Sequence, residues 1–558
     1  MNKKDLILNI LLFISQIIVF YYFFCYLFPF KEQLQMFQFT SQYLTETLKQ
    51  AGGVAIYISE FLSQFYVVFW TGPIISALLL TLVALLSSLI LKKINSRNDL
   101  PLIFLLPWLS LLIISLDYDY YEQGTIAYLF LLLFLWLYTN IKTRIKFIYG
   151  ICIIPILYGI AGPIVHLFAI SALFFEFLTN GKKKYISIIY LLIAALSAIA
   201  GTYLGYSRNL TLAFLPEAYC NPLQTVSGIY YAWYALPMTM LLVAYLKRYK
   251  EPVSLKGKCI WEGAQWAIMF LLVYQGIFHF GKLDAQHSMK QDYLLRTEQW
   301  DLVISEFNHD VLSKRRMCGL NLALAHKGQL SERLLDYPQH GIETLMLHWD
   351  QSIYTAQLHS DLYYCMGIIS AAQKFAFEAF VSSRSSGNPR MLKRLIETNL
   401  ITGSYPIADK YIQLLEKTWF YKDWATAHRR FLYNDKAVEE DKILGMKRRC
   451  WKAEASAAKL YTDPVSSLIN LLPACPDNKA GLAYLTSFLL LNKDIETYKT
   501  LQESLYRSPA WRDMTECQQE AIEIFCRKCK IFPVRGRILR SLWLPRMAKR
   551  IGTIICLI

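Results

Sequence analysis

Long apolar runs separated by short clusters of Lys and Arg constrain this chain more than any other feature. The first run covers residues 6–30, and a helix needs about 20 apolar residues to cross a bilayer. This run is too long for the core of a secretory signal and lacks a small-residue cleavage site, so we expect an uncleaved first span. Eight more runs are candidate spans: 73–91, 100–116, 124–141, 147–161, 163–178, 186–205, 228–246 and 261–280.

The stretch 147–178 has two interpretations, because Gly162 and Pro163 interrupt it. It forms either one long kinked span or a tight pair of spans. Charge favours the pair. With nine spans and a cytoplasmic N-terminus, 16 of the 19 Lys and Arg residues before residue 281 lie in cytoplasmic segments, as the positive-inside rule requires. One kinked span would instead move the cluster of Lys182, Lys183 and Lys184 to the outer side.

The predicted architecture is therefore all-α: a polytopic transmembrane bundle of about nine spans, followed by a helical tail. We predict three parts: 1–281 for the bundle, with an amphipathic first outer loop at 31–70; 282–534 for an extracytoplasmic helical repeat domain; and 535–558 for a basic C-terminal segment. The expected topology has the N-terminus in the cytoplasm and the C-terminal domain outside.

The formal net charge of +16 does not indicate a nucleic-acid partner. The positive charges lie between apolar runs, and no basic stripe interleaved with aromatic residues occurs. The twelve cysteines are irregularly spaced. Cys526 and Cys529 form one CxxC pair with no second pair downstream, which favours structural cysteines over a zinc site. The sequence indicates no metal and identifies no cofactor.

The acidic residues fall on the predicted outer side of the membrane. Glu32, Glu46 and Glu60 lie in the first outer loop, where Leu34, Phe37, Leu44 and Leu48 recur at helical spacing. This pattern predicts a helix lying flat in the membrane interface, or a re-entrant piece that packs over the bundle.

The second outer loop gathers Asp117, Asp119 and Glu122 among three tyrosines. Two interpretations stay open. The tyrosines anchor the span ends at the membrane surface and the acids stay hydrated, or the acids form a site. In an extended turn Asp117 and Asp119 point the same way, so that they could grip a divalent cation or serve as general base toward an acceptor hydroxyl.

The tail contains several helix–turn–helix patterns. In the clearest one, Gly403, Tyr405, Ala408, Tyr411 and Leu415 have the spacing of a tetratricopeptide turn and second helix. Stacked pairs of this kind form a curved solenoid that binds proteins or peptides. The alternative is an irregular helical domain that only supports the bundle. The C-terminal segment 535–558 is basic and too short to span, so we expect it on the membrane surface or packed on the tail.

The chain resembles an uncharacterised family of bacterial multi-span proteins with a helical tail. The segments that carry this resemblance are GGVAIYISEFLSQFY, LALAHKGQLSERLLDYPQ and LIETNLITGSYPIADKYIQLLEKTWFYKDWA. That family has no established activity to transfer.

In layout the chain is also similar to membrane glycosyltransferases of the C-type fold, which carry an acid soon after the first span and a second acidic motif after the third. Here Glu32 matches the first position, and Asp117 with Asp119 the second. The departure is that the first acid is a single Glu after Lys31. The resemblance implies a polyprenyl-phosphate-linked sugar as donor, catalytic roles for these three acids and a role for Arg208 in holding the lipid phosphate.

Two function classes follow from the sequence. The first is an envelope glycosyltransferase that uses the outer acids, with the lipid bilayer and a polyprenyl-phosphate sugar as partners. The second is a non-catalytic scaffold whose helical tail binds a protein partner.

Overall fold

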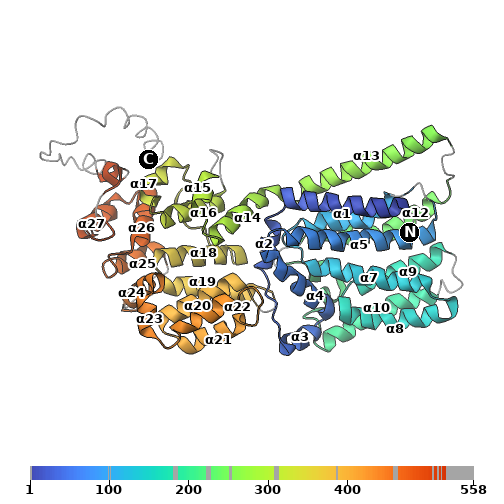
Figure 1. The fold of residues 1–558 in the computed structure, drawn as a ribbon, viewed down its shortest axis with the longest axis horizontal. Coiled ribbons are helices and arrows are strands. Elements are labelled where there is room, and N and C mark those ends of the chain that lie inside the picture. The colour runs from blue at the N-terminus through green and yellow to red at the C-terminus, as the bar shows by residue number, and fades with distance from the viewer. Residues whose placement is uncertain are drawn as a thin grey trace. The chain divides into compact units, whose positions relative to one another are not determined.

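The computed structural model is built from helices and their connections (Figure 1). It describes residues 3–97, 100, 102–179, 186–221, 226, 228–249, 254–306, 313–384, 387–456, 463–505, 508–511, 514–516 and 518–522. Within these ranges no β-strand forms, and one isolated antiparallel bridge joins Tyr120 to Cys220. The predicted all-α class is confirmed.

The chain divides into two compact units. Unit 1 comprises Met1–Lys290, Arg384–Gly387 and Lys417–Lys422; unit 2 comprises Gln291–Ser383, Asn388–Glu416 and Asp423–Ile558. The predicted boundary lies between residues 281 and 282, whereas the observed contacts divide the chain after Lys290. Two short segments of the predicted tail, Arg384–Gly387 and Lys417–Lys422, also belong to unit 1.

Unit 1 is a bundle of apolar helices that run alongside one another (Figure 1). Its principal helices are α1 (Lys3–Phe23), α5 (Thr71–Ile94), α6 (Leu106–Ser115), α7 (Glu122–Asn140), α8 (Thr143–Ala161), α9 (Val165–Leu178), α10 (Ile189–Tyr203), α12 (Ile229–Leu246) and α13 (Leu255–Phe280). Helix α5 packs against α1, α6 and α7, and α12 packs against α6 and α9. The side chains between these helices form one continuous buried core.

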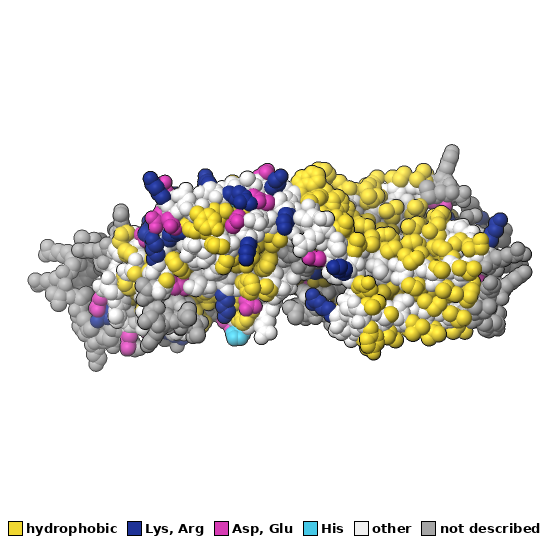
Figure 2. Space-filling model, turned by 90° about the horizontal axis from the view of Figure 1, so that it is seen from below, with side chains coloured by type: hydrophobic (Ala, Val, Ile, Leu, Met, Phe, Trp, Pro, Cys, Tyr) yellow, Lys and Arg dark blue, Asp and Glu magenta, His cyan; other side chains and the backbone are white. Residues whose placement is uncertain are grey.

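Several of these helices are long and apolar enough to cross a membrane. Among the described helices four pass this test, namely Asp5–Phe23, Thr71–Ile94, Glu122–Asn140 and Ile229–Leu246, and the bent pair Lys256–Phe280 with Leu283–Arg296 makes a fifth if it counts as one span. Large apolar side chains of α1, α10, α12 and α13 are exposed, and Figure 2 shows hydrophobic side chains covering the face of unit 1 that it presents. Exposed apolar surface of this extent suits a lipid environment.

The stretch 147–178 forms two helices, α8 and α9, and not one kinked helix. Gly162 separates them with φ +82°, a conformation that glycine adopts without strain. The hydroxyl of Tyr219 bridges the break: it donates to the carbonyl of Ala161 at 2.5 Å and accepts from the backbone N–H of Ile164 at 3.2 Å. A side chain from another loop thus satisfies backbone groups that the interrupted helix leaves free.

The predicted first outer loop folds into short helices. These are α2 (Leu27–Glu32), α3 (Ser41–Leu48) and α4 (Gly53–Ser63). The predicted helix starts too early, at Leu34. Phe37 is buried in a segment that is not helical, and α3 begins only after Thr40, which caps it by accepting from the N–H of Tyr43 at 3.1 Å. Gly52 then takes φ +76°, and a Cβ there would lie 3.0 Å from the carbonyl of Ala161.

In its described residues, unit 2 consists of helices and the loops that connect them. Its helices are α15 (Trp300–Ser305), α16 (Lys314–His326), α17 (Leu330–Arg333), α18 (Ile353–Met366), α19 (Ile369–Ser382), α20 (Pro389–Thr402), α21 (Tyr405–Leu415), α23 (Asp435–Glu440), α24 (Lys442–Ser456), α25 (Pro464–Leu471), α26 (Lys479–Leu491) and α27 (Ile495–Leu505); α14 (Leu283–Arg296) and α22 (Lys422–His428) begin in unit 1.

Helices α18 to α21 pack in chain order, each against the next. Gly367 ends α18 and Gly403 ends α20, both with positive φ, so each turn is a left-handed C-cap. The predicted helix–turn–helix at residues 403–415 is therefore present as the α20–α21 pair. A regular tetratricopeptide array stays a prediction. The predicted basic segment 535–558, the CxxC pair Cys526–Cys529 and the cluster Lys182–Lys184 lie outside the described residues.

Candidate functional site

Glu32 lines a small, partly open pocket in unit 1. Its lining residues come from the predicted first outer loop, from α4 and from the returning segment Lys417–Lys422: Glu32, Gln35, Met36, Phe37, Glu60, Gln64, Thr418, Trp419, Phe420 and Tyr421. We call this space the Glu32 pocket. Glu32 is the last residue of α2, and Glu60 lies in the last turn of α4. Both carboxylates are almost fully buried, at 3% and 1% exposure.

Two polar side chains position the Glu32 carboxylate. The hydroxyl of Tyr421 donates to it at 2.8 Å, and the amide of Gln33 donates to it as well. The same amide lies 3.0 Å from the Tyr421 hydroxyl. Burial and these two donors fix the orientation of the carboxylate.

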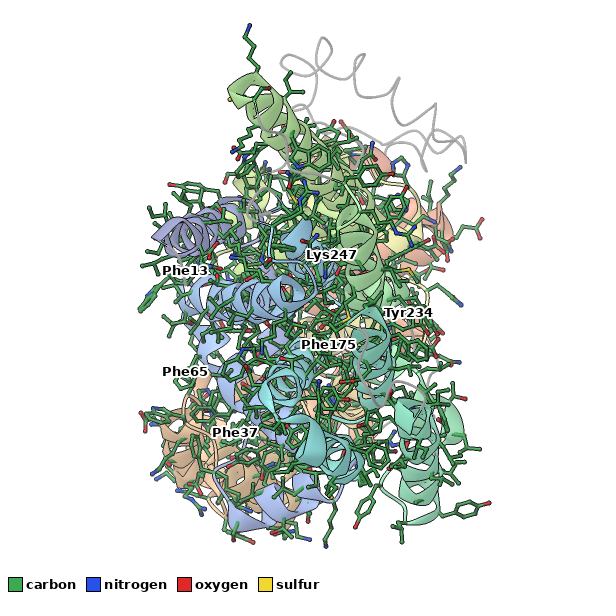
Figure 3. All side chains as sticks on the ribbon, turned by 90° about the vertical axis from the view of Figure 1, so that its right-hand side faces the viewer. Phe13, Phe37, Phe65, Phe175, Tyr234 and Lys247 are labelled. Carbon is green, nitrogen blue, oxygen red and sulfur yellow. The ribbon has the colours of Figure 1, made fainter. Side chains whose placement is uncertain are left out.

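Phe37, Trp419 and Phe420 are aromatic residues that line the Glu32 pocket, and they contact further rings outside its lining. Phe37 packs edge-on against Phe61 at 5.4 Å, and Phe61 packs against Phe65 at 5.5 Å between ring centroids. Phe65 in turn contacts Phe420 at 5.9 Å. Figure 3 labels Phe37 and Phe65, which lie at the same edge of the bundle. A pocket with aromatic walls and a few oriented carboxylates is the usual form of a small-molecule site.

A second group, the Asp117 cluster, consists of Asp117, Asp119, Asn221 and Lys282. The ammonium of Lys282 lies 2.9 Å from a carboxylate oxygen of Asp117 and 3.2 Å from one of Asp119. Asn221 donates its side-chain amide to Asp119 at 3.1 Å. Asp119 is fully buried, whereas the side chain of Lys282 is 36% exposed. The two acids therefore share one cation at the edge of the core.

Backbone pairing between two loops positions this cluster. The N–H of Asn221 donates to the carbonyl of Asp119 at 2.8 Å, and the N–H of Tyr121 donates to the carbonyl of Tyr219 at 2.9 Å. Lys282 lies at the 57° bend between α13 and α14, with φ +42°. This conformation is strained for a side chain with a Cβ, and the two carboxylates compensate by binding its ammonium.

Burial and charge act in opposite directions on these groups. Burial raises the pKa of Asp119, and the hydrogen bond from Asn221 opposes this. Burial would lower the pKa of Lys282, but the hydrogen bond and charge of Asp117 outweigh it, so the pKa is raised. Lys282 thus stays protonated at neutral pH.

Lys31 connects the Asp117 cluster to the bundle core. Its ammonium is buried at 7% exposure and donates to the carbonyl of Ser115 at 3.0 Å. Burial lowers its pKa, while the carboxylates of Glu122 and Asp117 act against this. Glu122 is buried as well and accepts from the hydroxyl of Ser76 at 3.3 Å. Lys31 is therefore a buried cation whose charge is opposed by the nearby carboxylates of Glu122 and Asp117.

Arg384 adds a further cation from the returning segment Arg384–Gly387. Its guanidinium lies over the ring of Tyr121 at 4.4 Å and donates to the side-chain carbonyl of Gln123. Stacking of this kind holds a guanidinium flat against an aromatic face. No group of three or more His, Cys, Asp or Glu side chains in the described ranges is placed to hold a metal ion.

The structure brings some of the predicted site residues together. Asp117 and Asp119 share Lys282, and Glu32 lines its own pocket, whose lining includes neither aspartate. Arg208 is exposed in the loop between α10 and α11 (Leu210–Phe214) and does not line the Glu32 pocket. The catalytic and phosphate-binding roles of these four residues stay predictions.

Sequence reasoning gave no site role to Lys31, Lys282, Arg384 and Tyr421, and it named Glu60 and Glu122 only as members of the acidic loops. For Lys31 and Glu122 a signal exists, because both are charged residues at the ends of apolar runs. No local signal marks Tyr421, because it reaches Glu32 from 389 positions away.

The sequence profile of one family matches residues 2–540, and that family is described as a family of unknown function (DUF6057). No curated protein and no solved structure matches the chain. The predicted resemblance to an uncharacterised family is confirmed to that extent, and the match extends over both units.

Proposed function

The chain belongs to the DUF6057 family, whose function is unknown, and from its own residues we propose that it is a bacterial inner-membrane glycosyltransferase. It takes sugar from a polyprenyl phosphate on the extracytoplasmic side, and the Glu32 pocket is its acceptor site. The observation that carries the proposal is this pocket, in which two buried carboxylates and a wall of aromatic rings adjoin a bundle of apolar helices.

The topology in this proposal has nine spans, with the N-terminus in the cytoplasm. Besides the four long apolar helices and the bent pair, four shorter apolar helices support this number: Ile103–Ser115, Ile145–Ala161, Val165–Leu178 and Ile189–Tyr203. The distribution of Lys and Arg supports the orientation. In this arrangement Glu32, Asp117, Asp119 and Arg208 all lie on the outer side, as does the tail.

The proposed chemistry is a displacement at the anomeric carbon. The Glu32 carboxylate accepts the proton of the acceptor hydroxyl while the new glycosidic C–O bond forms. The C–O bond to the phosphate breaks, and the polyprenyl phosphate leaves with the electron pair. Arg208 holds that phosphate through its guanidinium, and the Asp117 cluster keeps the outer loops in place around the donor.

Lipid and glycan profiling of a chromosomal Glu32→Gln strain tests the proposal. We expect the variant to accumulate the lipid-linked donor and to lose a sugar from an envelope glycan, as the deletion strain does. Glu46→Gln is the matched control, because Glu46 lies in the same loop but is exposed, and it should leave the envelope unchanged. An unchanged profile in both the Glu32→Gln strain and the deletion strain would refute sugar transfer.

The second candidate function is a scaffold that binds a protein through unit 2. It is supported by the serial packing of α18 to α21, since stacked helix pairs present extended binding surfaces. Affinity purification of the full-length protein separates the two functions. A scaffold retains one stoichiometric partner in both wild type and Glu32→Gln, whereas a transferase shows an altered glycan in the variant.

A further inference from the structure

Two buried thiols face each other in unit 2. Cys450 lies on α24 and Cys475 lies just after α25, with their sulfur atoms 2.8 Å apart. Their exposed fractions are 0% and 1%. Both cysteines are free thiols within hydrogen-bonding distance of each other, and a disulfide would bring the sulfur atoms to about 2.05 Å. The fold thus brings together two cysteines 25 positions apart.

The neighbouring backbone leaves these thiols little room to separate. A Cβ at Gly367 would lie 3.2 Å from the sulfur of Cys450. On the other side, the N–H of Cys475 donates to the carbonyl of Leu471 at 3.0 Å, and its carbonyl accepts from the N–H of Asn478 at 3.1 Å. Both side chains therefore stay in the orientation that faces the partner sulfur.

A buried lysine beside the pair favours thiol chemistry. Lys447 is 5% exposed, and its ammonium donates to the carbonyl of Cys365 at 3.0 Å. The hydrogen bond with Cys475 lowers the pKa of the Cys450 thiol, and the charge of Lys447 acts in the same direction. A thiolate is the species that attacks a disulfide, and the exchange takes place before packing buries the two sulfur atoms.

We propose that Cys450 and Cys475 form a disulfide in the mature protein, made while the tail folds outside the cytoplasm. The Cys450 thiolate attacks the disulfide of a protein disulfide donor, which gives a mixed disulfide and releases one donor thiol. Cys475 then displaces the second donor thiol. The two cysteines are oxidised, the donor disulfide is reduced to a dithiol, and their two protons pass to the donor sulfurs. This inference rests on the proposed orientation of the tail and not on sugar transfer.

Mass spectrometry of the full-length protein tests the bond. Intact cells are quenched with acid, and free thiols are alkylated in denaturant before digestion without reductant. We expect the peptides that contain Cys450 and Cys475 to be recovered as one cross-linked species. Cys318 is the internal control: its thiol donates to the carbonyl of Glu343 at 3.2 Å, and it should be alkylated. Recovery of alkylated Cys450 and Cys475 would overturn the proposal.

A second arm identifies the reason for such a failure. The purified protein is incubated with oxidised glutathione, and the same peptides are examined. A cross-link formed only in this arm means that the geometry holds and the compartment is reducing, so the proposed orientation is wrong. No cross-link in either arm means that the thiols do not meet. Where the bond is present, reduction should lower the melting temperature of unit 2 by about 5–10 °C, and a Cys450→Ser/Cys475→Ser variant should show no such response.

Discussion

At the scale of single residues, the balance between burial and charge decides which ionisable side chains contribute to stability. Lys282 bridges the carboxylates of Asp117 and Asp119, and its positive φ is an unfavourable conformation for a residue with a Cβ. Replacing it by Met leaves two buried carboxylates facing each other. We expect Lys282→Met to lower the free energy of unfolding by about 2 kcal/mol, since partial exposure of Lys282 moderates the effect.

Thermal unfolding in detergent measures this difference. Lys282→Arg should keep most of the stability because the positive charge remains. Lys49→Met is the control, because Lys49 is an exposed lysine of the same unit and should shift the melting temperature very little. Equal melting temperatures for wild type and Lys282→Met would show that the two aspartates do not depend on this cation.

In unit 2, Asp361 should make stability depend on pH. Its carboxylate lies 2.6 Å from Arg390 and 3.1 Å from Arg394. Burial alone would raise the pKa of Asp361, but the two guanidinium groups outweigh it, so the pKa lies below 3.8. A carboxyl whose pKa is lower in the folded state contributes stability above its unfolded pKa and loses it as pH falls through the folded pKa.

The corresponding experiment compares wild type with Asp361→Asn over pH 3 to 7. We expect the variant to be less stable by about 3 kcal/mol at neutral pH, with the difference closing below about pH 3.8, as the carboxyl of the wild type becomes protonated. Asp301→Asn is the control, since Asp301 is 80% exposed beside Lys327 and should change stability by under about 0.5 kcal/mol. A gap that stays constant down to pH 3 would contradict this account.

At the scale of elements, the break between α8 and α9 depends on a side chain from a distant loop. Tyr219→Phe removes the hydroxyl that bonds both Ala161 and Ile164, which leaves a buried carbonyl and a buried N–H unsatisfied. We expect a loss of about 2 kcal/mol. Hydrogen exchange followed by mass spectrometry should show faster exchange around residue 164, whereas Tyr231→Phe, which alters a tyrosine that is 74% exposed, should not.

At the scale of the whole molecule, the two units differ in the solvent that their surfaces suit. Figure 2 shows mixed charges over the face of unit 2 and hydrophobic side chains over the face of unit 1. Leu11 on α1 is 59% exposed and Leu302 on α15 is 49% exposed, so matched substitutions can compare the two surfaces. We expect Leu11→Arg to cost about 3 kcal/mol of membrane insertion and Leu302→Arg to cost almost nothing.

Carbonate extraction of membranes measures how firmly each of the two variants is inserted. The share of full-length protein that stays in the membrane pellet should fall for Leu11→Arg and remain at the wild-type level for Leu302→Arg. If Leu11→Arg is retained as well as wild type, α1 does not face lipid. A reporter fused after Phe280 tests the orientation separately: it should be active only outside the cytoplasm.

The sequence by itself determined the features that depend on neighbouring residues. Apolar runs become helices because each helix satisfies its own backbone hydrogen bonds, so α5, α7 and α12 could be predicted near their observed bounds. The first run, predicted as one span over 6–30, instead divides into α1, which ends at Phe23, and α2. The break at Gly162 and the turn at Gly403 could be predicted for the same reason, since both need a left-handed backbone that glycine adopts freely.

Only the tertiary structure decided which polar residues meet. Glu32 bonds Tyr421 from 389 positions away, and Lys282 reaches Asp117 across 165 positions. Such pairings follow from the packing of whole helices. A charged side chain is buried only where that packing also brings a hydrogen-bonding or oppositely charged group into contact with it. No local pattern of residues indicates which distant side chain will contact a buried acid. The sequence therefore predicted the acids, and the structure identified the residues that bind them.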